Sequence, residues 1–171
     1  TVVSEVFTDS EKHVDRVGAS LLTQTSLDFN NVLESLITVV TPLYTVTLTN
    51  QSGGSIINYT LTQSSSEKFK YMGGYDELGV YQPNRPVSLV IPSKRFCQPC
   101  LAYYDERKDG YFFINQPFKF SSFTTYADTV FLGPGESLDL NYSLHDEDGQ
   151  VLINKTVTIF SENYISNHVF A

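Results

Sequence analysis

The chain has 171 residues, of which 41% are hydrophobic and 18% are charged, and it carries twelve Phe and eleven Tyr but no Trp. These are values of a folded globular domain, so extended disorder is excluded except at the ends. The net charge of -8 argues against a nucleic-acid-binding protein and against purely electrostatic attachment to an anionic membrane.

Residues 1–16 are polar and charged, and we expect them to form an arm in front of a single domain at 17–171. They lack the apolar core of a signal peptide, so we interpret the chain as a mature form whose leader has been removed. Such an arm can add a strand to a neighbouring subunit, with its backbone providing affinity and its apolar side chains entering pockets. The predicted contact residues are Val2, Val3, Val6 and Phe7.

Residues 20–40 show the period of an amphipathic helix, and Pro42 is its predicted stop. This helix has two interpretations: it packs on the core, or it detaches to bind a bilayer or a partner through the same apolar stripe. The apolar positions on which the period rests are Leu22, Phe29, Val32, Leu33, Leu36 and Val40.

After Pro42 the apolar period changes to two, which is typical of strands. Residues 64–86 lack a strong period and are predicted to be a loop, either a functional insertion or a segment whose pattern is misread. Short strands with frequent turn signals predict a mainly β fold, an antiparallel β-sandwich with one N-terminal amphipathic helix. The predicted strands are 44–49, 56–63, 87–91, 101–104, 111–114, 128–132, 137–144 and 151–160.

Cys97 and Cys100 have the spacing of a redox pair. A redox site needs its first Cys at a helix N-terminus within a βαβ unit, whereas this pair runs into the strand predicted at 101–104. A structural disulfide between Cys97 and Cys100 is therefore favoured, and a redox pair and two free thiols are the alternatives.

No complete catalytic or metal-binding motif is present, so the sequence predicts no enzyme, no cofactor and no metal site. His13, His145 and His168 are scattered and are predicted to lie at the surface. Residues 146–149 resemble the start of a calcium loop, but Val157 occupies the position of its closing Glu, so a solvated hairpin tip is favoured.

Four Asn-X-Ser/Thr sequons are candidate glycosylation sites if the chain enters a secretory pathway: Asn50, Asn58, Asn141 and Asn154. Asn58 and Asn141 each alternate with apolar residues, so both are predicted to point away from the apolar face of their strands. Outward sequons on a β-rich chain favour a secreted or extracellular protein.

Several short motifs occur in an order that is similar to one known family. They are Gly18-Ala19-Ser20-Leu21, Val32-Leu33-Glu34, the strand at 44–49 ending in Asn50-Gln51-Ser52-Gly53-Gly54, Val90-Ile91-Pro92, Leu101-Ala102-Tyr103-Tyr104, and the stretch 137–161. Together, over residues 18–161, they resemble the actinoporins, a pore-forming family in which an amphipathic N-terminal helix leads into a β-sandwich. The resemblance implies that 20–40 lines a pore and that 137–161 corresponds to the phosphocholine-binding strands, although this chain has no Trp for the choline cluster of that family.

Two functions of different classes follow. The first is a non-enzymatic secreted or surface-displayed interaction or structural protein, an adhesin or filament subunit that assembles through its N-terminal arm with identical subunits or a protein partner. The alternative is an actinoporin-like membrane-binding pore former that uses the helix at 20–40, which neither the net charge nor the lack of Trp supports.

Overall fold

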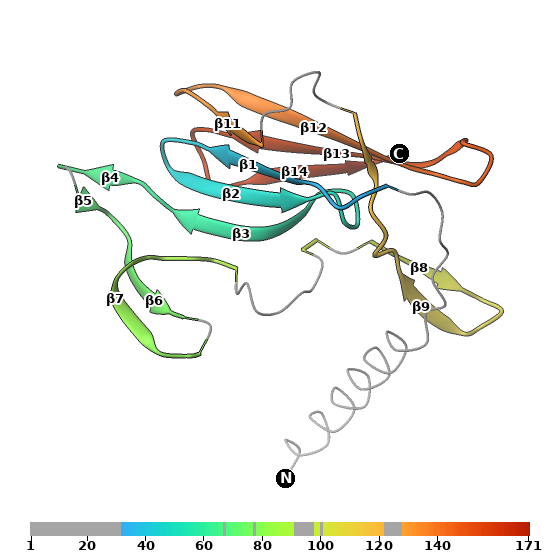
Figure 1. Ribbon diagram of the computed structural model, residues 1–171, viewed down its shortest axis with the longest axis horizontal. Helices are drawn as coiled ribbons and strands as arrows, with labels where there is room; N and C mark the ends of the chain where they lie inside the picture. Colours follow the sequence, from blue (N-terminus) through green and yellow to red (C-terminus); the bar gives the residue numbers. More distant parts are fainter. Residues whose placement is uncertain (1–31, 67, 77, 91–97, 100, 122–127) are drawn as a thin grey trace, which may run out of the picture.

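The computed structural model describes residues 32–66, 68–76, 78–90, 98–99, 101–121 and 128–171. Within these residues the protein is mainly β, which confirms the predicted class, and it contains no helix (Figure 1). The strands are β1 (Leu36–Val40), β2 (Tyr44–Thr49), β3 (Ser55–Leu61), β4 (Ser64–Ser65), β5 (Lys68–Phe69), β6 (Met72–Tyr75), β7 (Tyr81–Pro86), β8 (Ala102–Asp105), β9 (Gly110–Phe113), β10 (Lys119–Phe120), β11 (Thr129–Phe131), β12 (Ser137–His145), β13 (Val151–Phe160) and β14 (Ser166–Phe170).

Two four-stranded sheets make up the body of the molecule, and three short hairpins extend from it (Figure 1). The first sheet has the order β11-β1-β2-β3, and the second has the order β10-β12-β13-β14. Among the described strands all pairs are antiparallel except β1 and β11, which run parallel and so depart from the fully antiparallel arrangement that the sequence predicts.

Strict alternation explains why these segments form half-buried strands. In β2 the side chains of Tyr44, Val46 and Leu48 are buried, while the threonines between them are partly exposed. In β13 Val157 and Ile159 are buried in the same way. Each buried aliphatic side chain of this size stabilises the fold by about 1.5–3 kcal/mol.

The two sheets share one core, because buried residues from both belong to one hydrophobic cluster. Phe118, which precedes β10, is also fully buried in it. The Tyr44 hydroxyl links the sheets further by donating to the Phe160 carbonyl at 2.7 Å. The cluster consists of Ile37, Val39, Tyr44, Val46, Leu48, Tyr59, Phe118, Leu140, Tyr142, Leu144, Val157 and Ile159.

The predicted helix at 20–40 is wrong over its last residues, since Leu36–Val40 form β1. Ile37 and Val39 point into the core, while Leu36 is 49% exposed, so the alternation of a strand overrides the helical spacing. Residues 32–35 are not helical either, and residues 20–31 lie outside the described part of the chain. Pro42 does end the element, in the tight turn that joins β1 to β2.

The stretch 64–86 is not a single loop, because it holds the hairpins β4–β5 and β6–β7. Their strands are only two to six residues long, and a register shift between Met72 and Gly74 interrupts the period of two. Residues 87–90 of the strand predicted at 87–91 hold only an isolated bridge between Thr60 and Ser88, and residue 91 lies outside the described residues.

The turn between β2 and β3 packs directly against the second sheet. Ser52, Gly53 and Gly54 all have positive φ angles, of 52°, 66° and 84°. A Cβ on Gly54 would lie 2.5 Å from the Tyr142 ring, so this residue must be glycine for steric as well as conformational reasons. The turn thereby brings the Ser52 carbonyl within reach of the second sheet.

Candidate contact surfaces

Strand β14 forms one edge of the second sheet, and among the described strands it pairs only with β13. Asn154 and Ala171 exchange both backbone hydrogen bonds, at 2.8 and 2.9 Å. Bonded and non-bonded pairs alternate along an antiparallel ladder, so Asn167 and Val169 also direct their backbone groups toward β13.

The intervening residues of β14 direct their backbone groups outward. Ser166, His168 and Phe170 therefore offer three N–H and three C=O groups, which we call the β14 edge. Within the part of the chain that the structure describes, these six groups have no hydrogen-bond partner. An exposed row of this kind is a template for the addition of another strand.

The side chains of β14 divide between the two faces of the sheet. Phe170 and His168 stand opposite Lys155 and Val157, so they lie on the core side, whereas Val169 lies on the outer side. Phe170 and Val169 remain 42% and 52% exposed. A further strand beside β14 would cover more of both side chains.

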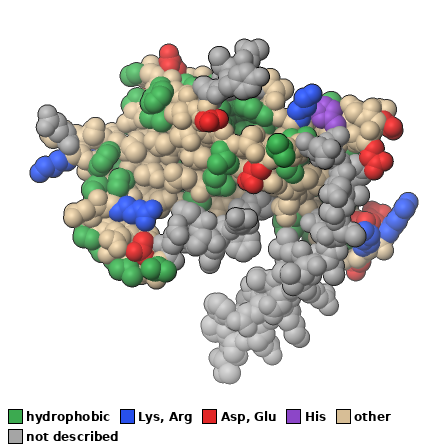
Figure 2. Space-filling model, viewed as in Figure 1, with side chains coloured by type: hydrophobic (Ala, Val, Ile, Leu, Met, Phe, Trp, Pro, Cys, Tyr) green, Lys and Arg blue, Asp and Glu red, His purple; other side chains and the backbone are tan. Residues whose placement is uncertain are grey.

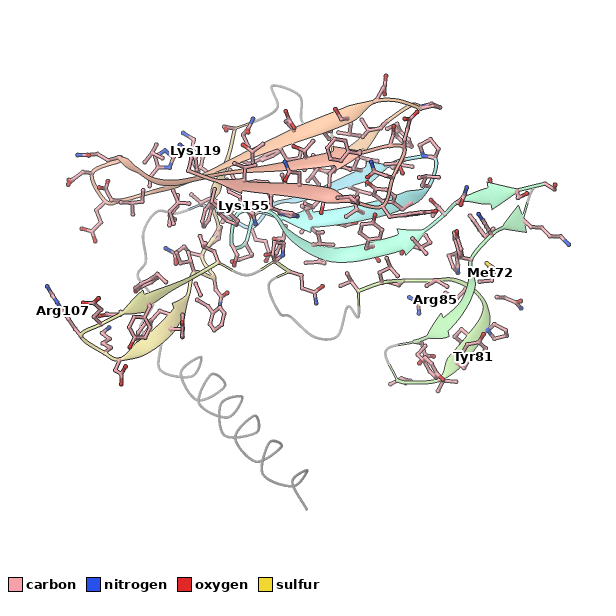
Figure 3. The ribbon with its side chains drawn as sticks, turned by 180° about the vertical axis from the view of Figure 1, so that it is seen from behind. Met72, Tyr81, Arg85, Arg107, Lys119 and Lys155 are labelled. Carbon is pink, nitrogen blue, oxygen red and sulfur yellow. The ribbon has the colours of Figure 1, made fainter. Side chains whose placement is uncertain are left out.

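Lys155 lies on the core side of β13 and is 1% exposed, between the two sheets (Figure 3). Its ammonium group donates to the Ser52 carbonyl at 3.3 Å and sits 5.2 Å from the centre of the Phe170 ring. Because burial disfavours the charged amine, the pKa of Lys155 is lowered from 10.5 to about 8. The sequence shows Lys155 at an inward position, two residues before Val157, but a lysine there is normally taken for a surface residue.

His168 lies next to this lysine and differs from the surface histidine that the sequence predicts. Its Nδ1 is buried and has no hydrogen-bond partner among the described residues, and its Nε2 is 3.0 Å from the Ser166 hydroxyl. Burial, with a further contribution from the Lys155 charge, lowers the pKa of His168 to about 4. The imidazole is therefore neutral at physiological pH.

The first sheet also ends in an edge strand, β11, whose outer side pairs with no strand in the described ranges. Thr38 donates to the Asp128 carbonyl and Leu132 donates to the Val40 carbonyl, so Thr129 and Phe131 direct their backbone groups away from β1. The Phe131 side chain is 75% exposed. This β11 edge is shorter than the β14 edge, and it carries a large apolar side chain.

The β6–β7 hairpin is a third exposed surface, and hydrophobic side chains gather on it (Figure 2). Leu78 at its tip is 89% exposed and Tyr75 is 74% exposed. The Asp76 carboxylate is engaged within the hairpin, accepting from the backbone of Val80 and Leu78, and these bonds together with one from Gln82 lower its pKa. Nothing in this geometry resembles a catalytic carboxylate pair.

The structure separates the four sequons. Asn50 is 2% exposed, and its amide donates to the Leu33 and Phe118 carbonyls at 3.0 Å each, so the folded protein has no space for a glycan there. Asn141 and Asn154 are exposed, as is required of a glycosylation site. Asn58 is partly buried and points away from the core, since its neighbour Tyr59 is buried.

Other predicted site residues lie outside the described residues: the arm residues Val2, Val3, Val6 and Phe7, the pair Cys97 and Cys100, and His13. The acidic residues 146–149 fall in the turn between β12 and β13, as expected of a hairpin tip. No group of three or more metal-ligating side chains occurs among the residues that the structure describes.

No helix in the described ranges is long and apolar enough to cross a membrane. Comparison with known proteins shows that no protein-family model and no curated protein matches this chain.

Proposed function

We propose that this chain is a secreted or surface-displayed β-sandwich protein that assembles with identical subunits and acts without catalysis. The observation that carries the proposal is that β11 and β14 are edge strands whose outward backbone groups pair with no residue that the structure describes. Natural proteins usually protect such edges with Lys, Pro or bulges. β14 has the sequence Ser-Asn-His-Val-Phe, and its pairing with β13 has no register shift. It therefore has none of these protective features.

The N-terminal arm is the proposed donor for the β11 edge. Its apolar contact residues Val2, Val3, Val6 and Phe7 match the apolar Phe131 at that edge. A strand added beside β11 would hydrogen-bond to the outward groups of Thr129 and Phe131, and its side chains would cover the Phe131 ring. Secretion is supported by the exposed sequons Asn141 and Asn154.

The actinoporin-like alternative requires the stretch 20–40 to leave the body of the protein as one helix. Ile37 and Val39 are 6% and 0% exposed, and β1 pairs with strands on both sides. Detaching them would expose the core at a cost of about 1.5–3 kcal/mol for each side chain. For this reason assembly by contact is the function that we propose.

Deletion of residues 1–16 tests the proposal directly. We expect full-length protein to form ordered assemblies, visible by electron microscopy and as large species in sedimentation, and we expect the deletion to reduce them to small oligomers. Two matched point variants keep the full length of the arm and test whether its apolar side chains are needed. Phe7→Ser should reduce assembly as the deletion does, whereas Thr8→Ser should leave assembly unchanged. A full-length chain that stays monomeric at every concentration, or assemblies that survive the deletion unchanged, would contradict the proposal.

A further inference from the structure

The β14 edge is complementary to itself. Its outward residues Ser166, His168 and Phe170 are evenly spaced around His168. If a second β14 runs antiparallel beside it with the two His168 residues opposite each other, Ser166 of one copy faces Phe170 of the other. All three pairs are then of the bonded type, and the six free groups of each copy are used in six hydrogen bonds.

We propose that two copies of this chain form a two-fold symmetric dimer through antiparallel pairing of their β14 strands, with His168 on the symmetry axis. The pairing would join the two second sheets into one continuous eight-stranded sheet. This inference rests on the proposed self-assembly and identifies the partner at one edge.

Four observations favour a second copy as the occupant. The spacing of the free groups has two-fold symmetry, which is what an isologous contact needs. β14 carries no Lys, Arg, Asp, Glu or Pro that would oppose edge pairing. On the core side Phe170, now 42% exposed, would pack beside Ser166 of the other copy. On the outer side Val169, which is 52% exposed, would stand opposite Asn167 of the other copy.

A proline at the centre of the edge tests the backbone contacts. The His168 N–H points away from β13, so His168→Pro leaves the ladder within one chain intact but removes both donors at the symmetry axis. The loss of two hydrogen bonds should weaken the dimer about tenfold or more. His168→Val is the matched control, because it removes the imidazole and keeps the N–H. Sedimentation over a wide range of protein concentration measures both variants, and thermal melting confirms that each is folded.

Cysteine pairing tests the register without perturbing the edge. In the proposed dimer Asn167 and Val169 of different copies form a non-bonded pair, whose Cβ separation suits a disulfide. Mixing the Asn167→Cys and Val169→Cys chains under mild oxidation should yield mainly the mixed disulfide, identified by mass spectrometry. Either variant alone should cross-link much less.

The outcomes separate this inference from the proposed function. A dimer that persists without residues 1–16, is weakened by His168→Pro and forms the mixed disulfide supports β14 pairing. A dimer that is lost with residues 1–16 and is indifferent to His168→Pro would overturn it while leaving arm-mediated assembly standing. A full-length protein that is monomeric and forms no assemblies would overturn both.

Discussion

Lys155 and His168 give this protein an unusual response to pH at the residue scale. Both sit on the core side of the second sheet, and burial lowers the pKa of each, to about 8 for Lys155 and about 4 for His168. The ordinary values of 10.5 and 6.5 apply to the unfolded chain, which therefore binds protons more readily than the folded protein. The contribution of each group to stability therefore decreases as the pH falls from 10.5 to 8 for Lys155 and from 6.5 to 4 for His168.

We predict that the protein loses stability between pH 6.5 and pH 4, a range that we call the acid window, and that this loss depends on His168. As the pH falls from 6.5 to 4, the free energy of unfolding should decrease by about 1–2 kcal/mol, after allowing for the partial exposure of the ring. The decrease should be complete below pH 4. His168→Gln should remove it, because the amide does not titrate. Urea unfolding at a series of pH values, at a protein concentration where one species is present, measures the effect.

The variant Lys155→Met tests whether the charge of the lysine contributes to the acid window. Without the lysine charge, the pKa of His168 should move back toward 6.5 and the acid window should narrow. The decrease in stability between pH 10.5 and pH 8 should also disappear, since its source is the buried amine. An acid window that is the same in both variants and in the parent chain would show that other groups control it.

At the scale of the elements, Asn50 ties three segments together. Its side-chain oxygen accepts from the Ser35 N–H at 2.9 Å, and its amide donates to the carbonyls of Leu33 and Phe118. These bonds hold the segment before β1 and the segment before β10 against the end of β2. The residue that the sequence marks as a glycosylation site is thus a buried link in the structure.

We predict that Asn50→Ala destabilises the fold by about 2–3 kcal/mol, because it leaves the buried Phe118 carbonyl and the Ser35 N–H without partners. Asn154→Ala is the matched control: it also removes a sequon, but its side chain is exposed and it should change stability by less than about 0.5 kcal/mol. Chemical denaturation of the two variants compares them. If the two variants lose the same amount of stability, the hydrogen bonds of Asn50 do not stabilise the fold in the way that we infer.

The elements also differ in how far the sequence predicts them. β2 and β13 match the predicted ranges residue for residue, because long alternation leaves one face buried and the other solvated. The sequence does not predict β1, because Leu36 and Val40 also fit a helical spacing with Val32 and Leu33. It does not predict β14 either, because the inward residues of this strand include the polar Ser166 and His168 and therefore show no apolar alternation.

The candidate contact surfaces were predictable only in part, for a physical reason. The arm and its apolar residues follow from composition alone, but an open edge is a property of strand order. Which groups of β14 face outward depends on its register with β13, fixed by contacts far apart in the sequence. The burial of Lys155 is not predictable from the sequence for a related reason, since it depends on the β2–β3 turn that packs over this side chain.

At the scale of the whole molecule, the two proposed contacts have different symmetry. Pairing of β14 with β14 is isologous and closes after two copies, whereas an arm placed on the β11 edge of a neighbour is heterologous and can continue indefinitely. Together they extend the assembly, because each copy then contacts three others: one through β14, one through its own arm and one through the arm that its β11 edge receives. Neither contact alone would form the extended assembly with a dimeric repeat that the two contacts form together.

Two changes, deletion of residues 1–16 and His168→Pro, give four proteins: the unchanged chain, each single variant and the double variant. We predict a distinct assembly for each of them. The full-length chain should form filaments whose repeating unit is a dimer, and the chain without residues 1–16 should stop at dimers. His168→Pro should leave only arm contacts, so it should form rings or thinner filaments without a dimeric repeat. The two changes together should give monomers. Sedimentation and electron microscopy of the four proteins distinguish these products, and dimers in the doubly changed chain would mean that a third surface, such as the apolar β6–β7 hairpin, holds the copies together.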